Sequence, residues 1–180
     1  MNLHFRLLEE SAQYLFTAMA VLTALSLPLE SCAGDRLEFK ATHVTDNTKH
    51  VVLIAGDEEY RTEESMPMLA KILSVRYDCN STVLFSFGPD GADYIDPNNQ
   101  QGLRGLDALD SADLMIIGTR FRRPSAQQAQ HITEYLNAGK PVLGIRTATH
   151  AFNGDGSFQS ISYAQFGLKV LGEQLSLIHI

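Results

Sequence analysis

Three polar segments of this chain hold most of the side chains that could transfer a proton or bind a ligand. Each segment closely follows a short apolar run typical of a buried strand, at residues 50–55, 114–117 and 141–145. Because parallel strands share their carboxyl ends at one edge of a sheet, we expect the three segments to converge on one crevice. They are Asp57-Glu58-Glu59-Tyr60-Arg61, Thr119-Arg120-Phe121-Arg122-Arg123 and Arg146-Thr147-Ala148-Thr149-His150.

The side chains of these segments divide into proton-transfer groups and ligand-contacting groups. Carboxylates and imidazoles exchange protons near neutral pH, so Asp57, Glu58 and His150 are the candidate catalytic residues. Arginine presents a planar fork of donors, which suits an anionic or hydroxyl-rich ligand. The candidate ligand-binding residues are Glu59, Tyr60, Arg61, Thr119, Arg120, Arg122, Arg146, Thr147 and Thr149.

The same residues also allow purely structural roles. A carboxylate could cap the following helix, the arginines could form salt bridges with the acidic segment, and His150 could be a hydrogen-bonded structural residue. Arg123 is expected to face water before Pro124. The other histidines show no metal-ligand spacing with His150, so we predict no metal site. The chain has neither a dinucleotide-binding glycine pattern nor a phosphate-binding loop, and no cofactor is predicted.

Strand-like and helix-like segments alternate along the chain, which is typical of an α/β fold. A second strand is expected over residues 81–87, between the runs at 50–55 and 114–117. One helix is expected from Met66, with Pro67 tolerated near its first turn. Another is expected to open at Pro124 and to end at Gly139, with Ala129, Ile132 and Leu136 facing inward. The run at 141–145 is expected to be a strand covered on both faces.

Composition narrows the class of protein. A chain of 180 residues with 44% hydrophobic content can bury a core, and its length favours one domain. The formal net charge of −7 and the scattered Lys and Arg residues argue against nucleic acid as a partner.

The N-terminus resembles an export signal. A mostly apolar run ends near Pro28, and the small residues Ser31 and Ala33 precede Gly34. We predict a signal peptide at 1–33, a polar linker at 34–48 and an exported protein without a stable membrane span after cleavage. Lipoprotein anchoring at Cys32 is less favoured because Glu30 is out of place. An N-terminal membrane anchor or a misassigned start codon are the alternatives.

We predict that the last six residues, 175–180, are encoded by a sequencing adaptor. One back-translation of Leu-Ser-Leu-Ile-His-Ile matches a transposase end used in sequencing adaptors. We therefore expect the domain at 49–174 to be incomplete at its C-terminus, the alternative being an ordinary apolar strand. The encoding DNA distinguishes the two.

Three stretches of the chain together resemble the ThuA-like, or trehalose-utilisation, family. They are VLIAGDEEYRTEE from Val52, DLMIIGTRFR from Asp113 and GKPVLGIRTATHAFN from Gly139. The resemblance implies a class I glutamine amidotransferase-like domain: a flavodoxin-like three-layer sandwich with a mostly parallel central sheet. It also places Arg146 where amidotransferases carry the nucleophilic cysteine of a sharp turn, so glutaminase activity is not implied.

The function implied by this resemblance is the utilisation of trehalose or a related disaccharide, including 3-keto sugar intermediates. Two hypotheses stay open. The protein is an enzyme acting on a sugar derivative, or it is a non-catalytic carbohydrate-binding or oligomerisation module of a secreted protein. A cation site on the acidic segment is a weaker third. The expected partners are a small-molecule sugar and, as an option, further copies of the chain in a homo-oligomer.

Overall fold

A computed structural model of the chain describes residues 34–173, which belong to one compact unit. The predicted signal peptide, the Cys32 anchor and the segment 175–180 lie outside the described residues. Among residues 34–173, no helix combines the length and apolar character needed to cross a bilayer.

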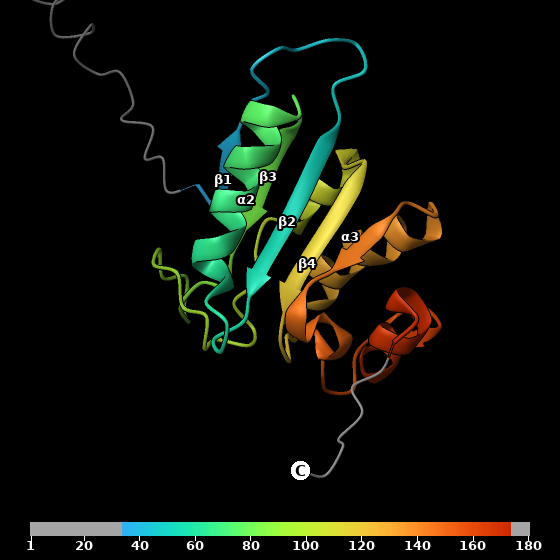
Figure 1. Cartoon of the computed structure of the whole chain (residues 1–180). Helices are drawn as coiled ribbons and strands as arrows, with labels where there is room; N and C mark the ends of the chain where they lie inside the picture. Colours follow the sequence, from blue (N-terminus) through green and yellow to red (C-terminus); the bar gives the residue numbers. More distant parts are fainter. Residues whose placement is uncertain (1–33, 174–180) are drawn as a thin grey trace, which may run out of the picture. The chain divides into compact units, whose positions relative to one another are not determined.

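A five-stranded sheet forms the centre of the fold (Figure 1). Its order is β1-β3-β2-β4-β5, and all neighbouring strands run parallel except β1, which is antiparallel to β3. The predicted α/β class and mostly parallel sheet are therefore confirmed. The strands are β1 (Arg36–Phe39), β2 (His50–Gly56), β3 (Asn80–Leu84), β4 (Leu114–Thr119) and β5 (Val142–Gly144).

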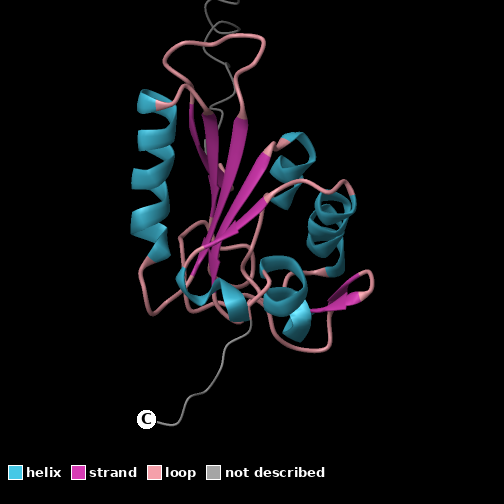
Figure 2. Ribbon diagram, turned by 45° about the vertical axis from the view of Figure 1, so that its right-hand side comes forward, coloured by secondary structure: helices cyan, strands magenta, loops and turns pink. Residues whose placement is uncertain are grey.

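Helices cover both faces of this sheet, which gives three layers (Figure 2). Helix α2 (Thr62–Arg76) packs Met66 and Ala70 on one face, against alternate residues of β2 such as Leu53. Helix α3 (Ala126–Asn137) and the short 3-10 helix η1 (Leu106–Ser111) cover the other face. Strand β2 is buried on both sides after its first residue, which explains its continuous apolar sequence.

The helix boundaries follow from local hydrogen bonds. In α3, the Ser125 side chain accepts a hydrogen bond from the Gln128 N–H, and Gly139 ends the segment with a φ of 66°. Helix α2 begins at Thr62 rather than at Met66. The Thr62 hydroxyl accepts hydrogen bonds from the N–H groups of Gly56 and Asp57, both at 3.0 Å, so the start of α2 is fixed directly to the end of β2.

Three expectations about the strands were wrong. The predicted linker at 34–48 contains β1, a short edge strand whose polar sequence gives no apolar run. Strand β3 ends at Leu84, and residues 86 and 87 form only isolated bridges. Strand β5 is not covered on both faces: Leu143 is 50% exposed, and among the described residues β5 pairs only with β4.

The segment after β5 folds around an aromatic cluster. It comprises the 3-10 helix η2 (Arg146–His150), the hairpin strands β6 (Ser157–Phe158) and β7 (Ile161–Ser162), the 3-10 turn η3 (Tyr163–Gln165) and the π-helical turn η4 (Gly167–Leu171). The ring of Phe152 lies 4.8 Å from that of Phe158 and 4.9 Å from that of Phe166, both edge-on. The cluster joins this segment to the α3 side of the core.

Replacing Phe152 by Ala should lower the free energy of unfolding by about 3–5 kcal/mol, because a buried ring with three aromatic neighbours is removed. Leu168→Ala is the control, since Leu168 is 49% exposed on η4 and its loss should cost about 0.5 kcal/mol or less. Urea denaturation of both variants measures the difference. Equal costs would mean that the aromatic cluster does not stabilise the fold.

Candidate functional site

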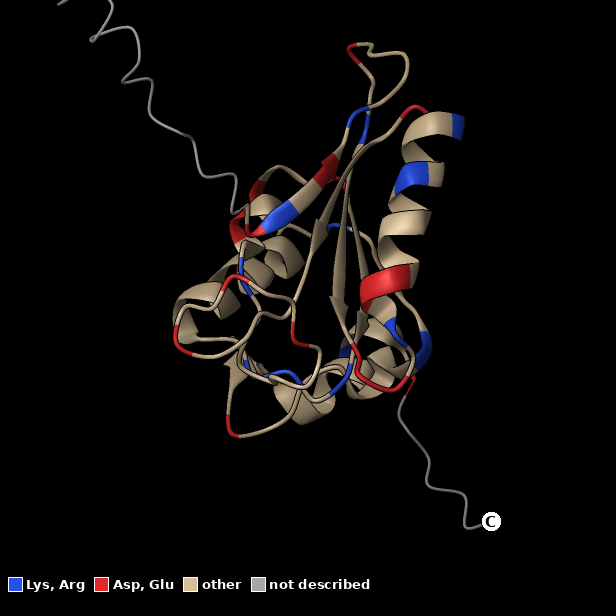
Figure 3. Cartoon of the chain, turned by 90° about the vertical axis from the view of Figure 1, so that its left-hand side faces the viewer, with Lys and Arg blue, Asp and Glu red and all other residues tan. Residues whose placement is uncertain are grey.

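The three polar segments converge at the carboxyl end of the sheet, as the sequence predicts. Side chains of the first segment contact both others: Glu58 pairs with Arg120, and Asp57 accepts a hydrogen bond from Thr147. Figure 3 shows acidic and basic stretches close together at this end of the strands. The converging groups separate into a buried hydrogen-bonded set, an ion-pair network and a smaller set of accessible groups.

Asp57 is fully buried and holds the loop after β2 in place. Its Oδ1 accepts hydrogen bonds from the N–H groups of Glu59 (2.9 Å) and Tyr60 (3.3 Å), while its Oδ2 accepts from the Thr147 hydroxyl. The Thr147 hydroxyl also lies 3.2 Å from the Thr119 carbonyl oxygen. Both carboxylate oxygens are thus engaged inside the protein, so the geometry favours a positioning role for Asp57.

Glu58, in the loop after β2, forms ion pairs with two arginines that follow β4. Its Oε1 lies 2.7 Å from Nη1 of Arg120, and its Oε2 lies 2.8 Å from Nη2 of Arg122. Glu59 adds a second, longer ion pair with Arg120, at 3.4 Å. Strands β2 and β4 are neighbours, but β2 is followed by β3 on one side and β4 by β5 on the other. In such folds, ligands usually bind at the carboxyl ends of two strands related in this way. Here the protein's own charges fill that position.

Arg122 is the centre of this network and is completely buried. Its Nε donates to the Arg120 carbonyl at 2.7 Å, and its Nη1 lies within 3.2 Å of the Ser86 hydroxyl and of the carbonyl oxygens of Pro97 and Asn99. Burial lowers the pKa of Arg122, and the negative charge of Glu58 opposes that shift. The lack of a side chain at Gly56 makes space for Arg122, since a Cβ there would lie 3.1 Å from Arg122 Cδ.

Arg146 is the first residue of η2 and lies at a sharp turn shortly after β5. Its φ of 58° lies in the left-handed region, which is unusual for a residue with a side chain and is typical of strand-to-helix turns that present a functional group. The side chain is exposed, and its guanidinium lies 4.8 Å from the centre of the Tyr60 ring. Arg146 and Thr149 line a hollow of about 310 Å³ beside β5.

His150 lies near the network without joining it. Burial and, to a smaller degree, the positive charge of Arg120 lower its pKa, which favours the neutral imidazole. Its ring centre is 5.1 Å from that of Phe121, and Nδ1 is 3.4 Å from the Thr149 hydroxyl. Of the predicted residues, Arg61 alone is engaged elsewhere: it pairs with Glu64 in the first turn of α2.

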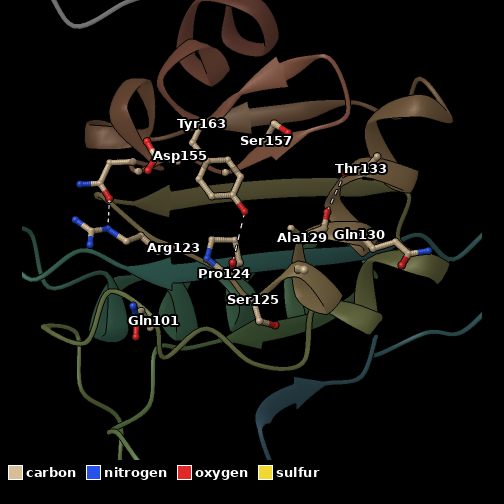
Figure 4. Close-up of a pocket in the computed structure, with 14 residues that line it drawn as sticks. Gln101, Arg123, Pro124, Ser125, Ala129, Gln130, Thr133, Asp155, Ser157 and Tyr163 are labelled. Carbon is tan, nitrogen blue, oxygen red and sulfur yellow. Dashed lines mark hydrogen bonds between the residues drawn. The ribbon is translucent and has the colours of Figure 1, made fainter.

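A further groove lies beside this convergence and was not predicted. It is a groove of about 780 Å³ between the start of α3, the loop 153–157 and Tyr163 (Figure 4). Arg123 lines it, and its Nε donates to Asn153 Oδ1 at 2.7 Å. One sequence feature could have indicated this groove. It is the polar loop Asn153-Gly154-Asp155-Gly156-Ser157, which begins shortly after the third segment. The groove is lined by Gln101, Arg123, Pro124, Ser125, Ala126, Ala129, Gln130, Thr133, Asn153, Gly154, Asp155, Gly156, Ser157 and Tyr163.

Neither a set of metal ligands among the described residues nor a similar protein indicates the chemistry of this site. No group of three or more His, Cys, Asp or Glu side chains among the described residues could hold a metal ion. Comparisons of the chain with known protein families, with curated proteins and with solved structures find no match. The functional argument therefore rests on the geometry of the groove and of the converging segments.

Replacing Arg122 by Met should destabilise the fold by about 3–5 kcal/mol, because Glu58 loses its buried partner and several carbonyl groups lose their donor. The neighbouring Arg123→Met is a matched control: Arg123 is exposed, and the same change there should cost about 0.5 kcal/mol or less. Chemical denaturation of the two variants gives the comparison. Similar costs would refute a central role for Arg122.

Stability should fall as the pH is lowered from 7.5 to 5.5. The pKa values of His50 and His150 are lowered in the folded protein, chiefly by burial, so the unfolded chain binds protons more readily below about pH 6.5. The lowered pKa values of Asp107 and Asp113 act only at more acidic pH. Denaturation of wild type and of His50→Gln/His150→Gln at several pH values should give a shallower dependence in the variant. An unchanged slope would contradict the assignment.

Proposed function

We propose that this protein is a ThuA-like domain of carbohydrate utilisation that binds a neutral, hydroxyl-rich ligand such as a disaccharide. The observation that carries the proposal is the groove of about 780 Å³ beside the converging segments. Its volume lies within the range of about 300–1,000 Å³ common for small-molecule sites.

The lining of the groove suits hydroxyl groups better than a charged ligand. Amide and hydroxyl side chains such as Gln101, Gln130 and Ser157 offer both donors and acceptors. Within the described part of the chain, the side chains of Gln101 and Ser157 form no hydrogen bond that would occupy them. Arg123 and Asp155 carry opposite charges, so the groove has no net charge to attract an ion.

Apolar lining residues complete the match to a sugar ring. Pro124, Ala126, Ala129 and the ring of Tyr163 line the groove, and the Tyr163 hydroxyl donates to the Pro124 carbonyl at 3.5 Å. Such a surface accommodates the C–H face of a pyranose while the polar rim contacts its hydroxyls.

The strand order supports the proposed flavodoxin-like family fold. Counted along the chain, the four parallel strands lie in the order 2-1-3-4, which is the beginning of the 2-1-3-4-5 order of flavodoxin-like sheets. The left-handed turn at Arg146 supports the proposed correspondence with the amidotransferase nucleophile position. An arginine there provides no nucleophile, which is why we propose no glutaminase activity.

Binding is favoured over proton transfer because Asp57 and Glu58 are already engaged within the protein. Catalysis on a keto sugar is the second candidate, favoured by the position of His150 in the third converging segment and by the burial that lowers its pKa. His150→Gln separates the two: an enzyme would lose turnover of the 3-keto sugar, whereas a binding module would show no turnover in either form.

Calorimetric titration of the 180-residue chain with trehalose and its 3-keto derivative should show binding. Gln130→Ala/Ser157→Ala should weaken it about tenfold or more, since two hydrogen bonds are removed. Gln127→Ala, on the same helix but outside the groove, should leave the affinity unchanged. No binding of any saccharide at millimolar concentration, or equal effects of the two changes, would refute the proposal.

A further inference from the structure

The outer face of α2 carries a stripe of exposed apolar side chains. Met68, Ile72 and Val75 are 65%, 45% and 55% exposed. Their spacing places them on one side of the helix, opposite the buried residues Met66 and Ala70. Helix α2 is therefore apolar on two faces, and only one of them packs against the sheet.

The charges around this stripe are asymmetric along the helix. Glu63 and Glu64 lie in the first turn, whereas Lys71 and Arg76 lie in the second half. Figure 3 shows this as a red band near one end of α2 and blue bands toward the other, with uncharged ribbon between them. A surface with an acidic end, an apolar middle and a basic end is complementary to its own copy in the reverse direction.

We propose that this stripe is the surface through which two copies of the chain pair, with their α2 helices antiparallel. A twofold axis between Met68 and Ile72 brings Met68 against Ile72 of the second copy, and Val75 against the small Ser65. The same axis brings Glu64 toward Arg76 of the second copy. Glu64 pairs with Arg61 through one oxygen, so its other oxygen accepts the new contact.

The arrangement selects against the parallel alternative. Two parallel helices would place Glu64 beside Glu64 and Arg76 beside Arg76, which is repulsive at both ends of the stripe. The contact is also small, because a helix of 15 residues is only about 22 Å long. A single helix pair lies at the low end of specific interfaces, so the dimer is weak, with a dissociation constant of about 10–100 µM.

Sedimentation velocity of the 180-residue chain over a concentration series tests the proposal. Wild type should shift from monomer to dimer across this range, and Met68→Glu/Ile72→Glu should remain monomeric throughout. The control Val44→Glu/Leu168→Glu introduces the same charges at sites that are 71% and 49% exposed but lie outside α2, and it should dimerise like wild type. Unchanged circular dichroism melting temperatures verify that each variant is folded.

A charge exchange tests the antiparallel geometry. Glu64→Lys alone and Arg76→Glu alone should each weaken the dimer at least threefold, whereas the double variant Glu64→Lys/Arg76→Glu should restore it, since each reversed charge again meets its opposite. A monomer at all concentrations would overturn the proposal. So would a dimer that survives Met68→Glu/Ile72→Glu, or a double variant weaker than both single ones.

Discussion

The buried guanidinium of Arg122 is the interaction on which the carboxyl end of this fold depends. It contacts the loop after β2 through Glu58, the segment after β3 through Ser86, and the 97–99 loop through two carbonyl oxygens. Chain segments far apart in sequence are thereby held by one side chain. A buried charge is tolerated only when it is paired and hydrogen-bonded, so all of these contacts must form together.

This constraint decides where a ligand can bind. The crevice between β2 and β4 is filled by Glu58, Arg120 and Arg122, and the loop there is fixed by the buried carboxylate of Asp57. Arg123, next in the chain, is exposed and lines the groove beside α3. Two adjacent arginines thus have opposite roles: one completes the protein interior and the other borders the space that is open to a ligand.

The sequence predicted the sheet and the convergence better than it predicted individual roles. Buried parallel strands such as β2 give continuous apolar runs, whereas the polar edge strand β1 gives none. The sequence placed Arg123 correctly in water, but it gave no sign that Arg122 is buried, because that burial depends on acceptors brought in by distant loops. The groove unites Gln101, Gln130 and Ser157, which only the tertiary structure brings together.

The central claim is that the ligand occupies the groove beside α3 while the Arg122 network stays intact. Amide chemical-shift mapping of the isotope-labelled chain during titration with trehalose tests this most directly. The account predicts saturable shifts at the amides of Gln101, Gln130, Asn153 and Ser157, with those of Glu58 and Arg122 unmoved. Saturable shifts confined to Glu58, Arg120 and Arg122, or none anywhere, would contradict it.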